Sequence, residues 1–381
     1  MTLRALSVSA VALVLACGPA DATSDSVSTG GGSTTSGGGE STYAVTSSTG
    51  GVVTTSGTDT SAGSASTSET SAGASTGDDT TGTTGDDTTG GVSTSTGDEE
   101  TGEVFDCASL PQGPLPYTIK PGPKASEDLA FDDEGNLVGA QEGNLFKSPF
   151  VGEAELWVPG AGGFIAGLRM TAKGILVYAD NSTSTLFRVK PENNFKEMVV
   201  SGLEYANGVE VDLEGFVYVA EQSGQRVRRI DPETGEFSIL AEGLVQPNGL
   251  SFSPDYKILY VGSFGGGTIT GIHLKPDMTV ETITTFMDGI GNGNLDGMAV
   301  DACGNVYVCE FGPATIWRMT PDGLSKVPLI ELGVDTSWIP NMQWGSGING
   351  WEKETLYVLD FSASRVFEVP LGIGDKPRAY P

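Results

Sequence analysis

The chain has 381 residues and a formal net charge of −29, from 49 acidic and 20 basic residues. Such an acidic protein is a poor partner for nucleic acid, because that binding rests on basic side chains that neutralise phosphates. The acidity is compatible with cation binding, but it also fits a surface that only keeps the protein soluble.

The N-terminal residues 1–17 resemble a bacterial lipoprotein signal peptide. Arg4 precedes an apolar run, residues 5–16, that is too short to span a bilayer as a mature helix. The run ends in Val-Leu-Ala-Cys, which resembles the lipobox whose cysteine is lipidated. An ordinary secretory signal with a chance cysteine is the alternative. We expect export and lipidation at Cys17, and Gly18 favours the outer membrane or cell surface over the inner membrane.

Residues 18–106 have the composition of a flexible linker. They are almost wholly Ser, Thr, Gly, Ala and Asp, and they contain fourteen acidic residues but no Lys or Arg. This stretch has too little apolar surface to offset the entropy of ordering it. The remaining 35 acidic and 19 basic residues after position 106 carry a net charge of −16. Residues 107–381 are enough for one large all-β domain.

Six similar units follow one another along this domain. In each unit an apolar residue opens the first strand, at intervals of 39 to 48 residues. This spacing is the length of a four-stranded propeller blade, and the Gly, Asp and Pro turns between alternating apolar residues are typical of strands. The sequence therefore predicts a six-bladed β-propeller, with residues 115–119 adding an outer strand to the sixth blade. The repeated apolar residues are Leu129, Leu168, Val209, Leu250, Met298 and Met342.

The position just before the first strand of each blade should lie at one rim of the central channel. That position holds oxygen donors in five of the six blades: Glu127, Asn207, Asn248, Asp296 and Asn341, with Ala166 in the remaining one. Hard oxygen ligands with a total charge of −2 suit Ca²⁺. None of the six rim positions holds the Cys or His that is typical of zinc sites. We predict a divalent-metal site, with Ca²⁺ preferred, at Glu127, Asn207, Asn248 and Asp296. Asn-Gly and Asp-Gly as ordinary turn dipeptides are the alternative.

The second strand of each blade runs back towards the same rim. It ends in a polar residue in five blades, namely Asp180, Glu221, Ser263, Glu310 and Asp360. We expect these side chains to surround the channel mouth, where they support the ligands or contact substrate. The alternative is that they are solvated strand ends.

These rim residues resemble those of the senescence marker protein/gluconolactonase/luciferin-regenerating enzyme family of six-bladed propellers. The resemblance covers about residues 120–370 and rests on Glu127, Asn207, Asp296-Gly297 and the run Pro247-Asn248-Gly249-Leu250 followed by Ser253-Pro254-Asp255. It implies that the four predicted ligands hold a catalytic Ca²⁺ or similar ion.

Two departures from the family pattern concern the substrate side of the rim. The first blade has Asp128-Leu129 and Phe131 where the family has Gly-Pro and Trp. Tyr205 stands where sugar-lactonase members often carry an Arg. This counts against a sugar-acid lactone as substrate, and we include Tyr205 among the predicted substrate contacts.

Two functions follow from this sequence. The first is a metal-dependent hydrolase that opens a lactone or similar ester, with Asp296 as base or nucleophile and Glu127 as the runner-up. The second is a non-enzymatic tethered propeller that binds a ligand or protein around a structural ion. We expect a monomer that meets the membrane only through its lipid.

Three further cysteines permit a disulfide in an exported domain. Connectivity cannot be deduced from the sequence. We favour a Cys107–Cys303 bridge, with Cys303–Cys309 as the alternative.

Overall fold

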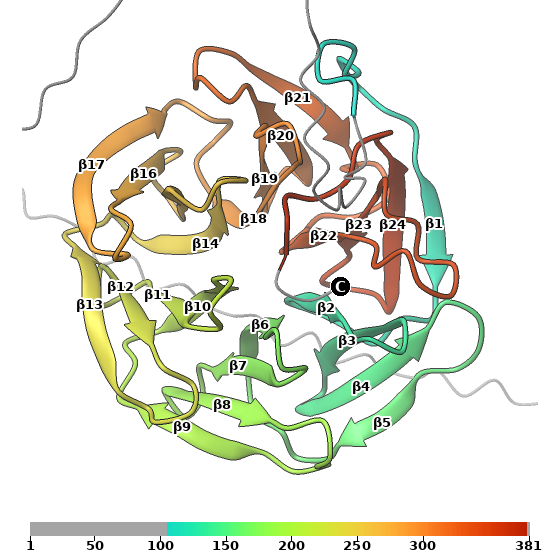
Figure 1. Cartoon of the computed structure of the whole chain (residues 1–381). Coiled ribbons are helices and arrows are strands. Elements are labelled where there is room, and N and C mark those ends of the chain that lie inside the picture. Colours follow the sequence, from blue (N-terminus) through green and yellow to red (C-terminus); the bar gives the residue numbers. More distant parts are fainter. Residues whose placement is uncertain (1–104, 379–381) are drawn as a thin grey trace, which may run out of the picture. The chain divides into compact units, whose positions relative to one another are not determined.

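The computed structural model describes residues 105–378, so the predicted signal peptide, Cys17 and all but the end of the linker lie outside the described residues. Within this range the regular elements are strands, grouped in six four-stranded sheets around a central axis (Figure 1). The predicted six-bladed β-propeller is confirmed. No helix in the described part of the chain is long and apolar enough to cross a membrane.

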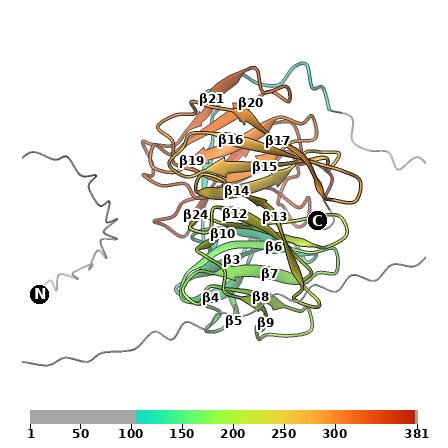
Figure 2. The same ribbon diagram turned by 90° about the vertical axis from the view of Figure 1, so that its left-hand side faces the viewer.

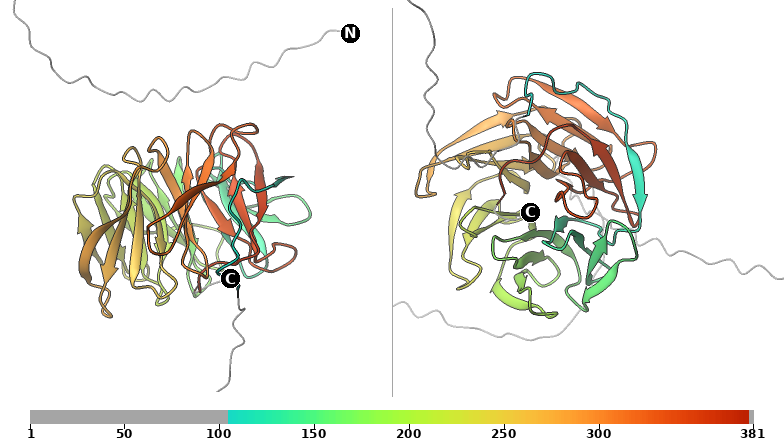
Figure 3. Two further views of the ribbon diagram at one scale, coloured as in Figure 1. Left: turned by 90° about the horizontal axis from the view of Figure 1, so that it is seen from above. Right: turned by 45° about the vertical axis from the view of Figure 1, so that its right-hand side comes forward.

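Each blade is an antiparallel sheet whose first strand lies nearest the axis, and the views from the side show the blades standing next to one another (Figure 2, Figure 3). Blades one to three contain β2 (Leu129–Phe131), β3 (Asn136–Gln141), β4 (Asn144–Pro149) and β5 (Glu155–Val158); β6 (Ile165–Met170), β7 (Leu176–Asp180), β8 (Thr185–Val189) and β9 (Glu197–Ser201); and β10 (Ala206–Val211), β11 (Val217–Glu221), β12 (Arg226–Ile230) and β13 (Phe237–Glu242). Blades four to six contain β14 (Pro247–Phe252), β15 (Ile258–Ser263), β16 (Ile269–Leu274) and β17 (Val280–Met287); β18 (Leu295–Val300), β19 (Val306–Glu310), β20 (Thr315–Met319) and β21 (Lys326–Glu331); and β22 (Met342–Trp344), β23 (Thr355–Leu359), β24 (Arg365–Pro370) and β1 (Thr118–Pro121).

The ring closes by a strand from the beginning of the domain. β1 pairs with β24, with Ile119 opposite Phe367, so the first strand completes the last blade. This confirms the predicted outer strand, although it begins at Thr118 rather than at residue 115. A disulfide between Cys107 and Cys303 ties the entering segment to the turn between β18 and β19. The remaining thiol, Cys309, is buried and free.

The core consists of six hydrophobic clusters, and each cluster fills the space between two neighbouring blades. Alternate residues of a strand point to opposite faces of its sheet. In β7, Leu176 and Tyr178 therefore pack towards the first blade, whereas Val177 and Ala179 pack towards the third. Because both faces are covered, the second strands are buried at every position in blades two, three, five and six.

An aspartate ends the inner strand in three blades and shapes the turn that follows. Asp212 accepts hydrogen bonds from the backbone N–H groups of Glu214 and Phe216, at 3.0 and 2.9 Å. Asp132 and Asp301 make the same pair of bonds in their blades. This Asx turn explains why Asp recurs at the end of the inner strand in every second blade.

Candidate metal centre

Three of the predicted ligands lie in β-bulges at the start of inner strands. In β10, β14 and β18 the inner strand has one residue more than its partner, between Ala206 and Val209 in the first of these. Asn207, Asn248 and Asp296 occupy the irregular positions. They are therefore the second residue of each strand, not the residue before it as we expected. A bulge re-aims a side chain out of the regular alternation of a strand.

The glycine after each of these residues is required by the neighbouring blade. A Cβ on Gly208 would lie 2.1 Å from the carbonyl oxygen of Asn248, and one on Gly249 would lie 2.1 Å from that of Asp296. Only glycine allows backbones to approach this closely. The Asn-Gly and Asp-Gly pairs here belong to strands, and they bring the bulges of adjacent blades next to one another.

Two acidic side chains, from blades one and five, lie near enough at this end of the axis for one to affect the pKa of the other. Burial raises the pKa of Glu127 well above its usual range, and the carboxylates of Asp296 and then Asp128 raise it further. Burial also raises the pKa of Asp296, and Asp128 adds to this, although hydrogen bonds from Asn248 and from the Gly297 N–H lower it. Like charges held close together in a buried place are unfavourable unless a cation lies between them. We call this end of the axis the carboxylate end.

The amide of Asn248 supplies an oxygen that has no partner. Asn248 is 1% exposed, and its Oδ1 atom accepts no hydrogen bond. A buried carbonyl oxygen without a partner is uncommon, and amide oxygens are ordinary ligands of Ca²⁺. In residues 105–378, no three His, Cys, Asp or Glu side chains gather as a metal-binding group. The residues present fit a hard cation held by two carboxylates and amide oxygens.

Two further predicted residues, Asn207 and Tyr205, lie at the start of the inner strand of blade three. Asn207 is half-buried in the third blade, and its carbonyl oxygen packs against Gly167 of the second. Tyr205, two residues earlier, is 44% exposed. Burial raises the pKa of its phenol, and the charges of Glu127 and Asp296 raise it further. The Tyr205 side chain therefore lies within the field of both acids.

A family model matches part of the propeller. Residues 229–359 match the model described as the SMP-30/gluconolactonase/LRE-like region. This match runs from β12 to β23, so it contains Asn248 and Asp296 but neither Glu127 nor Asn207. It covers 131 of the 381 residues. A search of curated proteins found no match.

Solved structures with similar folds include several propellers. A gluconolactonase from Xanthomonas campestris has 18% identity and a TM-score of 0.58, over 70% of this chain and 96% of that one. Regucalcin from Agrobacterium tumefaciens, described as a calcium-binding protein, has 18% identity and a TM-score of 0.53, over 70% and 97%. Virginiamycin B lyase from Staphylococcus aureus has 12% identity and a TM-score of 0.52, over 67% and 100%. At these identities the likeness concerns the fold.

Asp128 was not among the predicted site residues, and it joins three blades at this end of the axis. Arg169 Nη1 donates to both of its carboxylate oxygens, at 2.8 and 2.7 Å. The side chain of Asn341 donates to it at 2.7 Å, and the N–H of Leu168 at 2.8 Å. The side chain of Asn341, a rim residue that we did not predict as a ligand, therefore bonds to Asp128 within the protein. The one available signal was that an acid replaces glycine here in the first blade.

The four acids that end second strands lie inside the blades. Asp180 and Glu221 are fully buried and accept hydrogen bonds from the N–H groups of Phe164 and Glu204, in the loops that lead into β6 and β10. Asp360 accepts the hydroxyl of Thr336, and Glu310 accepts the N–H of Asn292. Instead of pointing freely into the channel mouth, these side chains hold the loops around it. In the fourth blade Ser263 donates to the carbonyl of Val245 in the same way.

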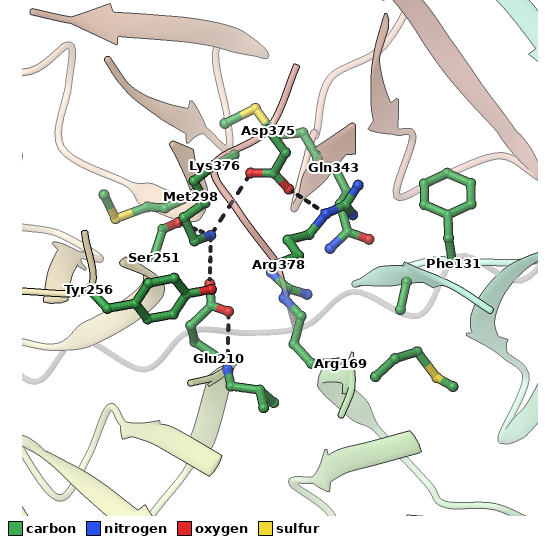
Figure 4. Close-up of a pocket in the computed structure, with 15 residues that line it drawn as sticks. Phe131, Arg169, Glu210, Ser251, Tyr256, Met298, Gln343, Asp375, Lys376 and Arg378 are labelled. Atoms are coloured by element: carbon green, nitrogen blue, oxygen red, sulfur yellow. Dashed lines mark hydrogen bonds and ion pairs between the residues drawn. The ribbon is translucent and has the colours of Figure 1, made fainter. Parts of the chain in front are cut away.

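The C-terminal segment crosses the opposite end of the axis, and Figure 4 shows its residues Asp375, Lys376 and Arg378 near Glu210, Ser251 and Tyr256. Residues 375–378 line a pocket together with the ends of the inner strands. Lys376 Nζ lies 3.0 Å from Ser251 Oγ and 3.5 Å from Glu210 Oε2, and Tyr256 donates to the carbonyl of Pro377. We call this the tail end. Because the C-terminal segment lies across the tail end, we expect a ligand to reach the predicted metal residues from the carboxylate end.

Proposed function

We propose that this propeller is a hydrolase that depends on a divalent cation and opens a lactone or similar ester at its carboxylate end. The supporting observations are the unpartnered, buried Oδ1 of Asn248, the buried Asp296 that Asn248 bonds to, and the half-buried Glu127, whose pKa the charge of Asp296 raises. The partial family match contains two of these three residues. Regucalcin, described as calcium-binding, has the same fold, which favours Ca²⁺ as the cation.

The side chains divide the work between them. Glu127, Asn207, Asn248 and Asp296 would hold the ion, which when bound supplies Lewis-acid polarisation of the ester carbonyl. The hydrogen bond from Asn248 orients Asp296. We assign Asp296 as the general base or nucleophile and Glu127 as its alternative. Tyr205, exposed beside both acids, is placed to donate a hydrogen bond to the substrate.

The test is hydrolysis of lactones and aryl esters by the purified protein with and without chelator. We expect turnover that is lost in EDTA and restored by Ca²⁺. Asp296→Asn should lower kcat by about 10²- to 10⁴-fold, the usual contribution of a general base. Asp288→Asn is the matched control, because Asp288 is an exposed acid in the loop that precedes β18.

Two results would contradict the proposal. Turnover that survives complete removal of divalent ions would show that hydrolysis does not depend on a cation. A bound ion without turnover of any ester, unchanged in Asp296→Asn, would identify a binding protein with a structural ion.

We also propose that the chain is exported and anchored to the outer membrane through Cys17. The support is the lipobox-like end of the apolar run. Wild-type protein should incorporate labelled palmitate and sediment with outer membranes, whereas Cys17→Ser should do neither. Membrane association that is unchanged in Cys17→Ser would contradict the anchor.

A further inference from the structure

One ring of residues lies directly outside the predicted ligands at the carboxylate end. In five blades the residue after the second strand donates its N–H to a carbonyl in the loop before the inner strand. Two of these bonds are Phe311 to Asn294 at 2.9 Å and Phe264 to Gln246 at 2.9 Å. Asn294 precedes Asp296 by two residues, and Gln246 precedes Asn248 by two. At about 3.3 Å per residue, this ring stands one layer above the ligands.

Aromatic residues occupy one side of this ring. Phe264, Phe311 and Phe361 follow the second strands of blades four, five and six, and Trp338 lies in the loop before β22. Ring centroids are 6.2 Å apart for Phe264 and Phe311, and 5.9 Å apart for Trp338 and Phe361. Phe311 and Trp338 stack at 6.1 Å with an interplanar angle of 11°. We call these four residues the aromatic sector.

Blades two and three carry polar residues at the position that follows the second strand. The residues after the second strands of blades two and three are Asn181 and Gln222, which bond to the carbonyls of Phe164 and Tyr205. Both polar atoms of the Asn181 side chain are buried without a hydrogen-bond partner. The residues that follow the second strands are therefore aromatic in blades four to six and polar in blades two and three, although the loop residues Phe164 and Tyr205 of the latter are exposed aromatics.

Trp338 is the exposed platform of the aromatic sector. It is 44% exposed, although one face stacks on Phe311. Its loop is fixed by the bond from Thr336 to Asp360 at 2.9 Å and by the N–H of Phe361, which donates to the Trp338 carbonyl. A large apolar surface held rigidly beside polar groups is typical of a ligand site, because little conformational entropy is lost on binding.

We propose that the aromatic sector binds an aromatic or other flat apolar group of the substrate, with Trp338 as the main specificity-determining residue. This rests on the proposed hydrolase function. A polyhydroxylated lactone would need several accessible hydrogen-bonding side chains around the mouth, and the unpartnered amide atoms of Asn181 are buried. The acids at this level, Asp180, Glu221, Glu310 and Asp360, are already bonded to their own loops. An aryl ester, or a lactone that carries an aryl group, needs only the stacking surface.

The test compares three lactones in the purified full chain: δ-valerolactone, its phenyl-substituted form and glucono-δ-lactone. Wild-type protein should prefer the phenyl-substituted lactone. Trp338→Ala should lower kcat/KM for the phenyl-substituted lactone about tenfold, chiefly by raising KM. The kcat/KM for δ-valerolactone should change less than about twofold. Trp338→Phe should retain most of the preference. Leu324→Ala, which removes an 83% exposed side chain from the turn between β20 and β21, should change nothing.

A binding measurement separates this inference from the proposed function. The probe is 2-phenyltetrahydropyran, an ether that keeps the aryl group but lacks the lactone carbonyl, followed by saturation-transfer NMR. Binding that is lost in Trp338→Ala, without hydrolysis of any lactone, would support the aromatic sector and overturn the hydrolase. Glucono-δ-lactone as the best substrate, an equal loss on all three lactones, or no binding of the ether would overturn the aromatic sector. So would a dimer in light scattering that dissociates in Trp338→Ala, because the sector would then contact a second copy.

Discussion

The two ends of the propeller axis bury acidic side chains in different ways. At the tail end, Glu210 is 7% exposed and Lys376 lies 3.5 Å away, while Arg378 pairs with Asp375 at 2.9 Å. At the carboxylate end, the charge of Asp296 raises the pKa of Glu127, and a third acid, Asp128, raises the pKa of both. A buried charge is unfavourable unless it is paired or coordinated. The chain supplies its own cations at the tail end, and we propose that the carboxylate end binds a cation from outside.

The largest effect should come from Asp128, which belongs to the carboxylate end but is satisfied by protein groups. Asp128→Ala would leave Arg169 buried without its partner and should lower the free energy of unfolding by about 3–5 kcal/mol. Urea unfolding of the purified protein in EDTA measures this. Asp288→Ala, at an exposed position, is the control. If the loss appeared only with Ca²⁺ present, Asp128 would be a ligand of the ion and would not be satisfied by protein groups alone.

A smaller loss is expected at the tail end. Lys376→Met removes the partner of Glu210 and the hydrogen bond to Ser251, and should cost about 1.5–3 kcal/mol, the usual range for hydrogen bonds to charged groups. The loss should be the same with Ca²⁺ and with EDTA. Lys275→Met, at an exposed turn, should be neutral. An unchanged stability in Lys376→Met would show that the C-terminal segment does not hold this end closed.

The opposite sign is expected for Asp296 when no metal is present. Asp296→Asn removes one of the acids that repel each other, so the metal-free protein should become more stable, by on the order of 1 kcal/mol. Thermal unfolding in EDTA measures the change. A destabilised metal-free variant would mean that the Asp296 charge is already compensated within the protein.

The smallest change concerns the acid range of pH. Burial alone would raise the pKa of Glu221, but hydrogen bonds from Arg226 and the Glu204 N–H outweigh this and lower it below its ordinary value of 4.5. The folded protein therefore releases this proton more readily than the unfolded chain does. The stabilisation is complete above pH 4.5 and is lost as the pH falls through the folded pKa. Glu221→Gln should flatten this fall in thermal unfolding between pH 7 and 3, whereas the exposed Glu242→Gln should not.

The propeller could be predicted because each blade repeats its own local signals. Apolar residues recur one blade length apart, and an Asp stands at the first turn of three blades, so these signals can be read from the sequence. The same repeat predicted that Asn207, Asn248 and Asp296 occupy equivalent positions. It did not predict the β-bulges in which they lie, because a bulge depends on the register with the next strand.

The remaining parts of the site depend on contacts between distant segments. Asp128 bonds to Asn341, 213 residues away, and Lys376 reaches Glu210, 166 residues away. No local pattern marks such pairs. The acids at the ends of second strands were expected at the channel mouth because the alternation of a strand does not show which loop will return to bond them.

The most direct test of the cation account is calorimetric titration of the metal-free protein with Ca²⁺. We predict one site per chain, binding that raises the unfolding temperature, and loss of both effects in Asp296→Asn and Asn248→Ala but not in Asp288→Asn. Absence of Ca²⁺ binding, or binding unchanged in both site variants, would contradict the claim that the carboxylate end holds a cation.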